Sequence, residues 1–148
     1  GCTTTQPNWQ NVDPLIVAAV QRVLTSPGSE IVVSRVSQIT IFKATSTGAD
    51  SGTHNIWTYT SSGTVKAPCA PGSDPALSFV DASYPNGDAW KASGRSNTSP
   101  TIDAIGVRVT YTYQFVTPLA TIMGWFGGGV APSITLNDQS VMVANPTT

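Results

Sequence analysis

The chain has 148 residues, a net charge of -1 and a pI of about 5.6, and only 10% of its residues are charged. An average soluble domain has roughly 25% charged residues, whereas here 20 Thr and 16 Ser supply most of the polar groups. Lys and Arg form no cluster, and this argues against nucleic-acid binding, which needs a basic surface that follows phosphates. The length suits a single domain over residues 1–148.

The first regular element is an amphipathic helix. It is predicted to begin at Asp13-Pro14, because Asp caps free backbone N–H groups and Pro suits a first helical turn. Pro27-Gly28 would end it. A 3.6-residue period predicts an apolar face that packs on a sheet, with Gln21 and Arg22 opposite: Ile16, Ala19, Val20, Val23 and Leu24.

The middle of the chain begins with a strand and becomes irregular. Glu30–Ala44 is rich in β-branched residues, and its apolar alternation changes parity, which predicts a bulge or burial on both faces. A turn over Thr45–Thr53 and a short strand over Ile56–Thr60 follow. Residues 61–101 contain five prolines, so we expect a long irregular excursion with short strand pieces.

Two further strands are predicted over Ile102–Val116 and Ser133–Val143. The first has apolar residues at alternate positions, with one face buried and one in water: Ile105, Val107, Val109, Tyr111, Tyr113 and Phe115. A compact crossover with a helical turn over Pro118–Gly124 would join the strands. The predicted fold is α+β, an antiparallel sheet packed on one N-terminal amphipathic helix. The alternative is a β-sandwich, if the excursion supplies more strands.

The sequence contains no recognisable catalytic, cofactor or metal site. The single histidine, His54, lies in a polar turn without a nucleophile motif beside it, so we expect a solvated loop histidine. Asp74, Asp81 and Asp88 are spaced seven residues apart, which does not match a calcium loop, and turn formation is their expected role. We therefore predict a protein that is not an enzyme and needs no cofactor.

Cys2 and Cys69 are the only cysteines, and neither has a Cys or His at metal-ligand spacing. In an exported protein they would form one disulfide between the N-terminal segment and the middle of the chain. The alternative is two unrelated free thiols.

The order of motifs in the second half of the chain resembles that of TadE-like pseudopilins, minor subunits of tight-adherence (Flp-type) pili. The likeness covers residues 88–146. It rests on Trp90, Arg95 and Asn97, on Asp103-Ala-Ile-Gly-Val-Arg-Val, on the strand Val107–Phe115 running into Thr117-Pro118-Leu119, and on Ser140-Val141-Met142-Val143-Ala-Asn-Pro146. Relatives tend to have an acidic residue where this chain has Asn145.

The resemblance implies a pilin-like fold and a non-catalytic role as a minor pilin or pseudopilin of a Tad/Flp-type pilus or related secretion apparatus. The implied partners are other pilin subunits and the assembly machinery, at an extracytoplasmic, membrane-anchored or pilus-associated location. Such proteins have an N-terminal hydrophobic helix, which this sequence lacks, and we expect the membrane contact to come from a helix preceding Gly1. The alternative function is a secreted or surface-anchored adhesin that binds glycan through Trp57, Trp90 or Trp125.

Overall fold

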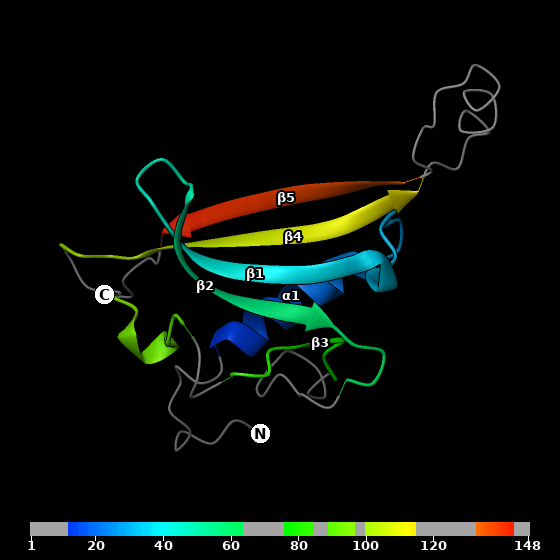
Figure 1. Cartoon of the computed structure of the whole chain (residues 1–148), viewed down its shortest axis with the longest axis horizontal. Helices are drawn as coiled ribbons and strands as arrows, with labels where there is room; N and C mark the ends of the chain where they lie inside the picture. Colours follow the sequence, from blue (N-terminus) through cyan, green and yellow to red (C-terminus); the bar gives the residue numbers. More distant parts are fainter. Residues whose placement is uncertain (1–11, 64–75, 85–88, 97–99, 115–132, 144–148) are drawn as a thin grey trace.

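A computed structural model of the protein describes residues 12–63, 76–84, 89–96, 100–114 and 133–143. Its elements are α1 (Val12–Leu24), β1 (Val36–Ala44), β2 (Asp50–Tyr59), β3 (Phe79–Val80), β4 (Ala104–Gln114) and β5 (Ser133–Val143), with short 3₁₀ helices η2 (Val33–Arg35) and η3 (Ala92–Gly94). The strands form one antiparallel sheet in the order β3-β2-β1-β4-β5. Helix α1 lies on one face of it (Figure 1).

This arrangement confirms the predicted α+β class. The described strands belong to one sheet, so they do not show the β-sandwich alternative. None of the helices in this part of the chain has the length and apolar character that crossing a bilayer requires. Several predictions fall outside the described residues: those for Cys2, Cys69, Asp74, Asp88, Trp125 and the turn over Pro118–Gly124.

The buried face of α1 agrees only in part with the predicted apolar face: Ile16, Val20 and Leu24 pack against the core as predicted, whereas Ala19 and Val23 are exposed. Val17 is fully buried and Leu24 nearly so, whereas Val23 is 68% exposed. The physical reason is a set of polar contacts that fixes the rotation of the helix. Gln21, predicted to face away from the sheet, donates to the carbonyl of Ala76 and accepts from the backbone N–H of Ser78, at 3.1 and 2.7 Å.

Strand β1 starts at Val36, later than predicted, because η2 occupies residues 33–35. The predicted irregularity is confirmed: the β1–β4 register shifts between Val36 and Gln38, and the β1–β2 register shifts between Phe42 and Ala44. Both faces of β1 therefore bury large side chains. Ile39 and Ile41 face α1 and belong to the core, while Phe42 is fully buried on the opposite face.

Strand β2 is longer than predicted and begins at Asp50, inside the segment predicted as a turn. Its polar first half pairs with the end of β1, with His54 opposite Phe42 and Asp50 opposite Ala44. The turn itself is closed by Thr45, whose hydroxyl accepts from the N–H of Ala49 at 3.1 Å. This part of β2 has no apolar alternation. It is a strand because it pairs with β1, and its own composition does not favour a strand.

Strands β4 and β5 match the prediction closely. β4 spans Ala104–Gln114 and β5 spans Ser133–Val143. The alternate apolar residues of β4 pack against the core as predicted from Ile105 to Tyr111, whereas Tyr113 is 38% exposed. The fully buried apolar side chains between the sheet and α1 are Val17, Val36, Ile39, Ile41, Trp57, Leu77 and Phe79.

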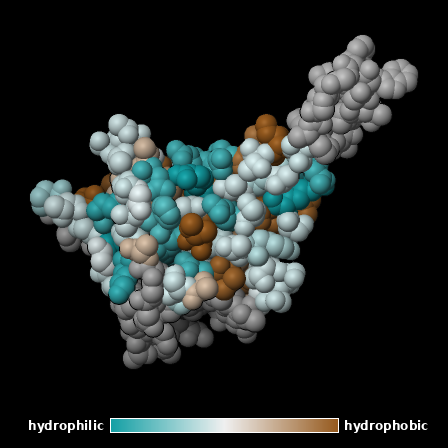
Figure 2. Space-filling view, in the orientation of Figure 1, coloured by the Kyte–Doolittle hydropathy of each residue, from teal (hydrophilic) through white to brown (hydrophobic). Residues whose placement is uncertain are grey.

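The sheet face turned away from α1 is polar. Figure 2, in the same orientation as Figure 1, shows this face as mostly hydrophilic with separate hydrophobic residues. The sequence accounts for this, because the residues between the core positions of β4 are mainly Gly, Arg, Thr and Gln. Strand β4 thus has one face toward the core and one toward water, as the period-2 pattern predicts, while Phe42 of β1 is buried on the polar face beside Arg108.

Candidate functional site

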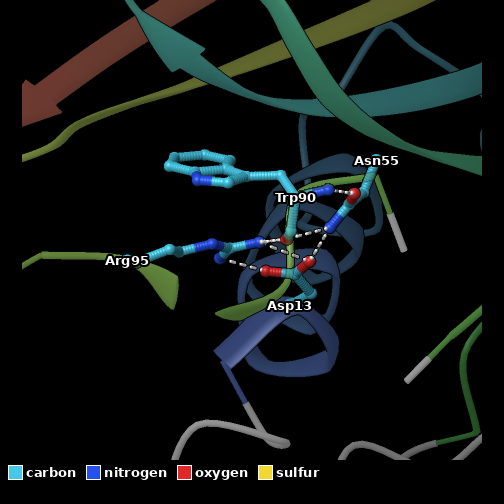
Figure 3. A network of polar contacts seen from close by, with 4 residues as sticks. All are labelled: Asp13, Asn55, Trp90 and Arg95. Atoms are coloured by element: carbon cyan, nitrogen blue, oxygen red, sulfur yellow. Dashed lines mark hydrogen bonds and ion pairs between the residues drawn. The ribbon is translucent and has the colours of Figure 1, made fainter. Parts of the chain in front are cut away.

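The most elaborate polar site in the described residues is a buried network of four residues: Asp13, Asn55, Trp90 and Arg95 (Figure 3). Asp13 comes from the first turn of α1, and its side chain is fully buried. Both of its carboxylate oxygens accept hydrogen bonds from Arg95, through Nη1 and through Nη2 at 2.8 Å. Asp13 was predicted to act as a helix cap, so the sequence pattern missed this ion pair.

Asn55 connects the same carboxylate to the chain around Trp90. Its Nδ2 donates to Asp13 Oδ2 at 2.8 Å and to the carbonyl of Trp90 at 2.9 Å. Its Oδ1 accepts from the backbone N–H of Trp90 at 2.9 Å. The amide of Asn55 therefore pairs with both backbone groups of one residue, in the way that a neighbouring strand would.

Arg95 completes the network from the segment that follows Trp90. Its Nη2 also donates to the Trp90 carbonyl at 3.0 Å, and its guanidinium carbon lies 4.2 Å from the centre of the indole ring. The Arg95 side chain is only 7% exposed. A buried charge is strongly unfavourable unless it is paired, so removing either partner of this ion pair leaves a large uncompensated penalty.

A second ion pair fixes the start of β4. Lys43 Nζ lies 2.7 Å from Asp103 Oδ1, and the backbone N–H of Ser96 donates to Oδ2 at 2.9 Å. The N–H of Asp103 donates in turn to the carbonyl of Ser96 at 2.8 Å. Burial opposes the ionisation of Asp103, but the bonds from Lys43 and Ser96 outweigh it, so the pKa of Asp103 lies below its ordinary value.

A third polar cluster lies on the face of the sheet away from α1. Asp50 Oδ2 is 3.2 Å from both Arg108 Nη2 and His54 Nδ1, and the N–H of Gly52 donates to Oδ1 at 2.8 Å. Arg108 also lies over the ring of Phe42, 5.0 Å from its centre. Burial opposes the ionisation of Asp50, but Gly52, His54 and Arg108 outweigh it and lower its pKa.

Gly106 explains how Phe42 can be buried on that face. The two residues are directly opposite in the β1–β4 pairing. A Cβ on Gly106 would lie 2.1 Å from Phe42 Cζ, so a side chain at this position would occupy the space of the ring. Glycine is needed here for space, because the phenyl ring takes the place of a side chain on β4.

These three polar clusters join the elements of the fold, and within the described residues they show no recognisable catalytic arrangement. His54 lies in a strand beside Asp50, which corrects the prediction of a solvated loop histidine. Within the described residues, no group of three or more His, Cys, Asp or Glu side chains could hold a metal ion. Asp81 forms a local turn in which its carboxylate accepts from the N–H and hydroxyl of Ser83, as predicted.

The tryptophans proposed as glycan contacts are internal where the structure describes them. Trp57 is fully buried, and its ring centre lies 5.3 Å from that of Tyr84. Trp90 is 6% exposed and is covered by Arg95. An adhesin that recognises sugar needs accessible aromatic rings, and these two do not provide them.

Five of the residues that carried the family resemblance have a structural role. Trp90 and Arg95 belong to the buried network, Asp103 pairs with Lys43, and Gly106 and Arg108 pack around Phe42. No protein-family model, curated protein or solved structure matches this chain.

Proposed function

We propose that this chain is the extracytoplasmic domain of a minor pilin or pseudopilin of a Tad/Flp-type pilus or a related secretion apparatus. It acts by shape, as a non-catalytic subunit that other pilin subunits and the assembly machinery recognise. The observation that carries the proposal is the joining of α1 to the segment of family resemblance through Asp13 and Arg95. In this proposal the segment from Trp90 to Arg108 fixes the body of the subunit to its N-terminal helix.

Buried hydrogen bonds of Asp13 connect the first turn of α1 to the sheet and support this proposal. In the proposed subunit a hydrophobic helix precedes α1 and anchors the protein in the membrane or the pilus. The anchoring helix would set the orientation of α1, which follows it in the chain. Asp13 in the first turn of α1 connects α1 to β2 through Asn55 and to the Trp90 segment through Arg95. Because the hydrogen bonds are buried, water does not compete for them.

Deletion of the gene in the native organism tests this proposal. Surface pili are counted by electron microscopy after complementation with the wild type, with Arg95→Ala and with the exposed control Arg22→Ala. We expect no pili in the deletion strain, recovery with the wild type and with Arg22→Ala, and poor recovery with Arg95→Ala. Normal piliation of the deletion strain would contradict the proposed function.

A further inference from the structure

Strand β5 presents a long edge that pairs with no other strand of the described residues. One side of β5 pairs with β4 over eleven residue pairs, from Gln114 opposite Ser133 to Ala104 opposite Val143. The order β3-β2-β1-β4-β5 places β5 at one end of the sheet (Figure 1). At the opposite end, β3 is only two residues long. Among the described residues, the outer side of β5 is therefore a row of backbone N–H and C=O groups that no strand pairs with.

Of the features that commonly prevent pairing at a sheet edge, β5 has one, the charge of Asp138 on the α1 face opposite Val109, and lacks the others. Natural edges are short, bulged, or carry Lys or Pro. β5 contains no Lys, Arg or Pro, its register with β4 is continuous, and Asp138 is its single charge. Its exposed side chains include Ile134 at 46% and Met142 at 64%.

The turn between β1 and β2 lies close to the C-terminal half of β5 and, in the view of Figure 1, extends past its outer edge. It approaches β5 at Val141, where a Cβ on Gly48 would lie 3.8 Å from Val141 Cγ2. Val141 is opposite Gly106 and so belongs to the sheet face turned away from α1. The turn thus lies over that face and forms no strand pairing with β5 in the described residues.

We propose that β5 pairs antiparallel with β5 of a second copy of this chain, about a two-fold axis at Gln139. This inference rests on the sheet edge and is independent of the proposed pilus function. The two sheets would join into one continuous sheet of ten strands, with both α1 helices on the same face. The nine residues from Thr135 to Val143 would form roughly eight to ten backbone hydrogen bonds between the copies.

The sequence of β5 is complementary to itself in this register. Asp138 is opposite the partner's Ser140, so the charge meets a hydroxyl that can donate to it. Leu136 is opposite the partner's Met142, and both lie on the face of α1, because their β4 partners are Tyr111 and Ile105. A register centred on Asp138 would instead place two carboxylates directly opposite, which is destabilising. The pairing of Asp138 with a hydroxyl and of Leu136 with Met142 therefore favours a second copy in the register centred on Gln139.

The expected association is weak, because one strand edge buries less area than a standard protein interface. We expect a dissociation constant of roughly tens to hundreds of micromolar. Sedimentation equilibrium of the folded protein at increasing concentration measures it. Ser140→Lys places a cation opposite Asp138 at two symmetric positions, and Ser140→Asp places a carboxylate there, so the two variants introduce opposite charges at the same position.

We expect Ser140→Lys to dimerise about tenfold more tightly and Ser140→Asp about tenfold more weakly than the wild type, since two cross-strand pairs change in each dimer. Gln139→Lys, which brings two cations together at the axis, should also weaken the dimer and serves if Ser140→Asp fails to fold. Thermal unfolding followed by circular dichroism checks the fold of each variant. Monomers at about 1 mM for both the wild type and Ser140→Lys would overturn the proposal and leave the edge to a strand of another protein. A dimer that none of the three charges affects would overturn it as well.

Discussion

Arg95 donates through both terminal nitrogens to the carboxylate of Asp13, which lies 82 residues earlier in the chain. This ion pair joins the first turn of α1 to the segment between η3 and β4, two parts of the chain that no local pattern relates. Asn55 and the Trp90 carbonyl share its hydrogen bonds. The network is therefore where the helix, the sheet and the irregular segment are held in one arrangement.

Replacing Arg95 should be strongly destabilising. Arg95→Ala leaves the Asp13 carboxylate buried without its cation, and we expect a loss of about 3–5 kcal/mol in the free energy of unfolding. Arg22→Ala removes the same charge from an exposed position of α1 and should cost about 0.5 kcal/mol or less. Urea unfolding of both variants measures the difference. Equal midpoints for the two would show that the ion pair does not stabilise the fold.

The double variant Asp13→Ala/Arg95→Ala separates the ion pair from the surrounding packing. If the unpaired charge is the main penalty, the double variant should be less destabilised than the sum of the two single changes, with a coupling of about 1–3 kcal/mol. Strict additivity would mean that each residue contributes through its own packing alone.

Gly106→Ala should destabilise the protein through Phe42. The new Cβ would lie 2.1 Å from the ring, so the ring must move and the free energy of unfolding should fall by about 1–3 kcal/mol. Gly94→Ala is the control, because nothing lies within 4 Å of a Cβ at that position. Phe42→Leu makes room and should reduce the effect of Gly106→Ala. No such rescue in the measured melting temperatures would contradict the steric explanation.

The two lowered pKa values predict a loss of stability in acid. A carboxyl whose pKa is lowered in the folded state stabilises the protein above its unfolded value of 3.8, and this stability is lost as the pH falls through the folded value. The free energy of unfolding should therefore decrease from about pH 5 downward. Asp103→Asn should flatten part of this decrease, while Glu30→Gln removes a charge from an exposed position as the control. An unchanged pH profile for Asp103→Asn would show that Lys43 and Ser96 do not stabilise the ionised carboxyl.

The two faces of β4 should respond differently to a charge. Val109 packs against the core and is opposite Ile39, so Val109→Asp should cost several kcal/mol. Thr110 lies on the other face, and Thr110→Asp loses one exposed hydrogen bond to Asn137, at about 1 kcal/mol or less. Melting temperatures measured side by side decide this. Similar values would mean that the faces are assigned wrongly.

Much of the fold could be predicted because the patterns of its elements are local. The limits of β5 match the predicted strand, the core positions of β4 follow from alternation, and the parity change in β1 indicated the register shifts that the structure contains. The rotation of α1 could not be predicted, since it depends on Gln21 and Asp13 bonding to distant segments. The first half of β2 is a strand because β1 pairs with it, and its polar composition gives no such signal.

The site was only partly visible in the sequence. Trp90 and Arg95 stood out through the family resemblance, whereas nothing around Asn55 distinguishes it from a turn residue. Its role depends on a position in β2 from which its amide reaches Asp13 and both backbone groups of Trp90. Such long-range satisfaction of buried polar groups is a property of the folded chain, and single-sequence patterns do not encode it.

The most direct test of the proposed function is the location of the complete gene product in the native organism. Cells carrying a C-terminal epitope tag are separated into cytosol, membrane, sheared surface pili and culture medium, and the protein is detected in each fraction. We predict recovery with the membrane or the sheared pili, held there by a hydrophobic helix that precedes this domain. Recovery in the cytosol, or as a freely secreted protein with a conventional cleaved signal, would contradict the account.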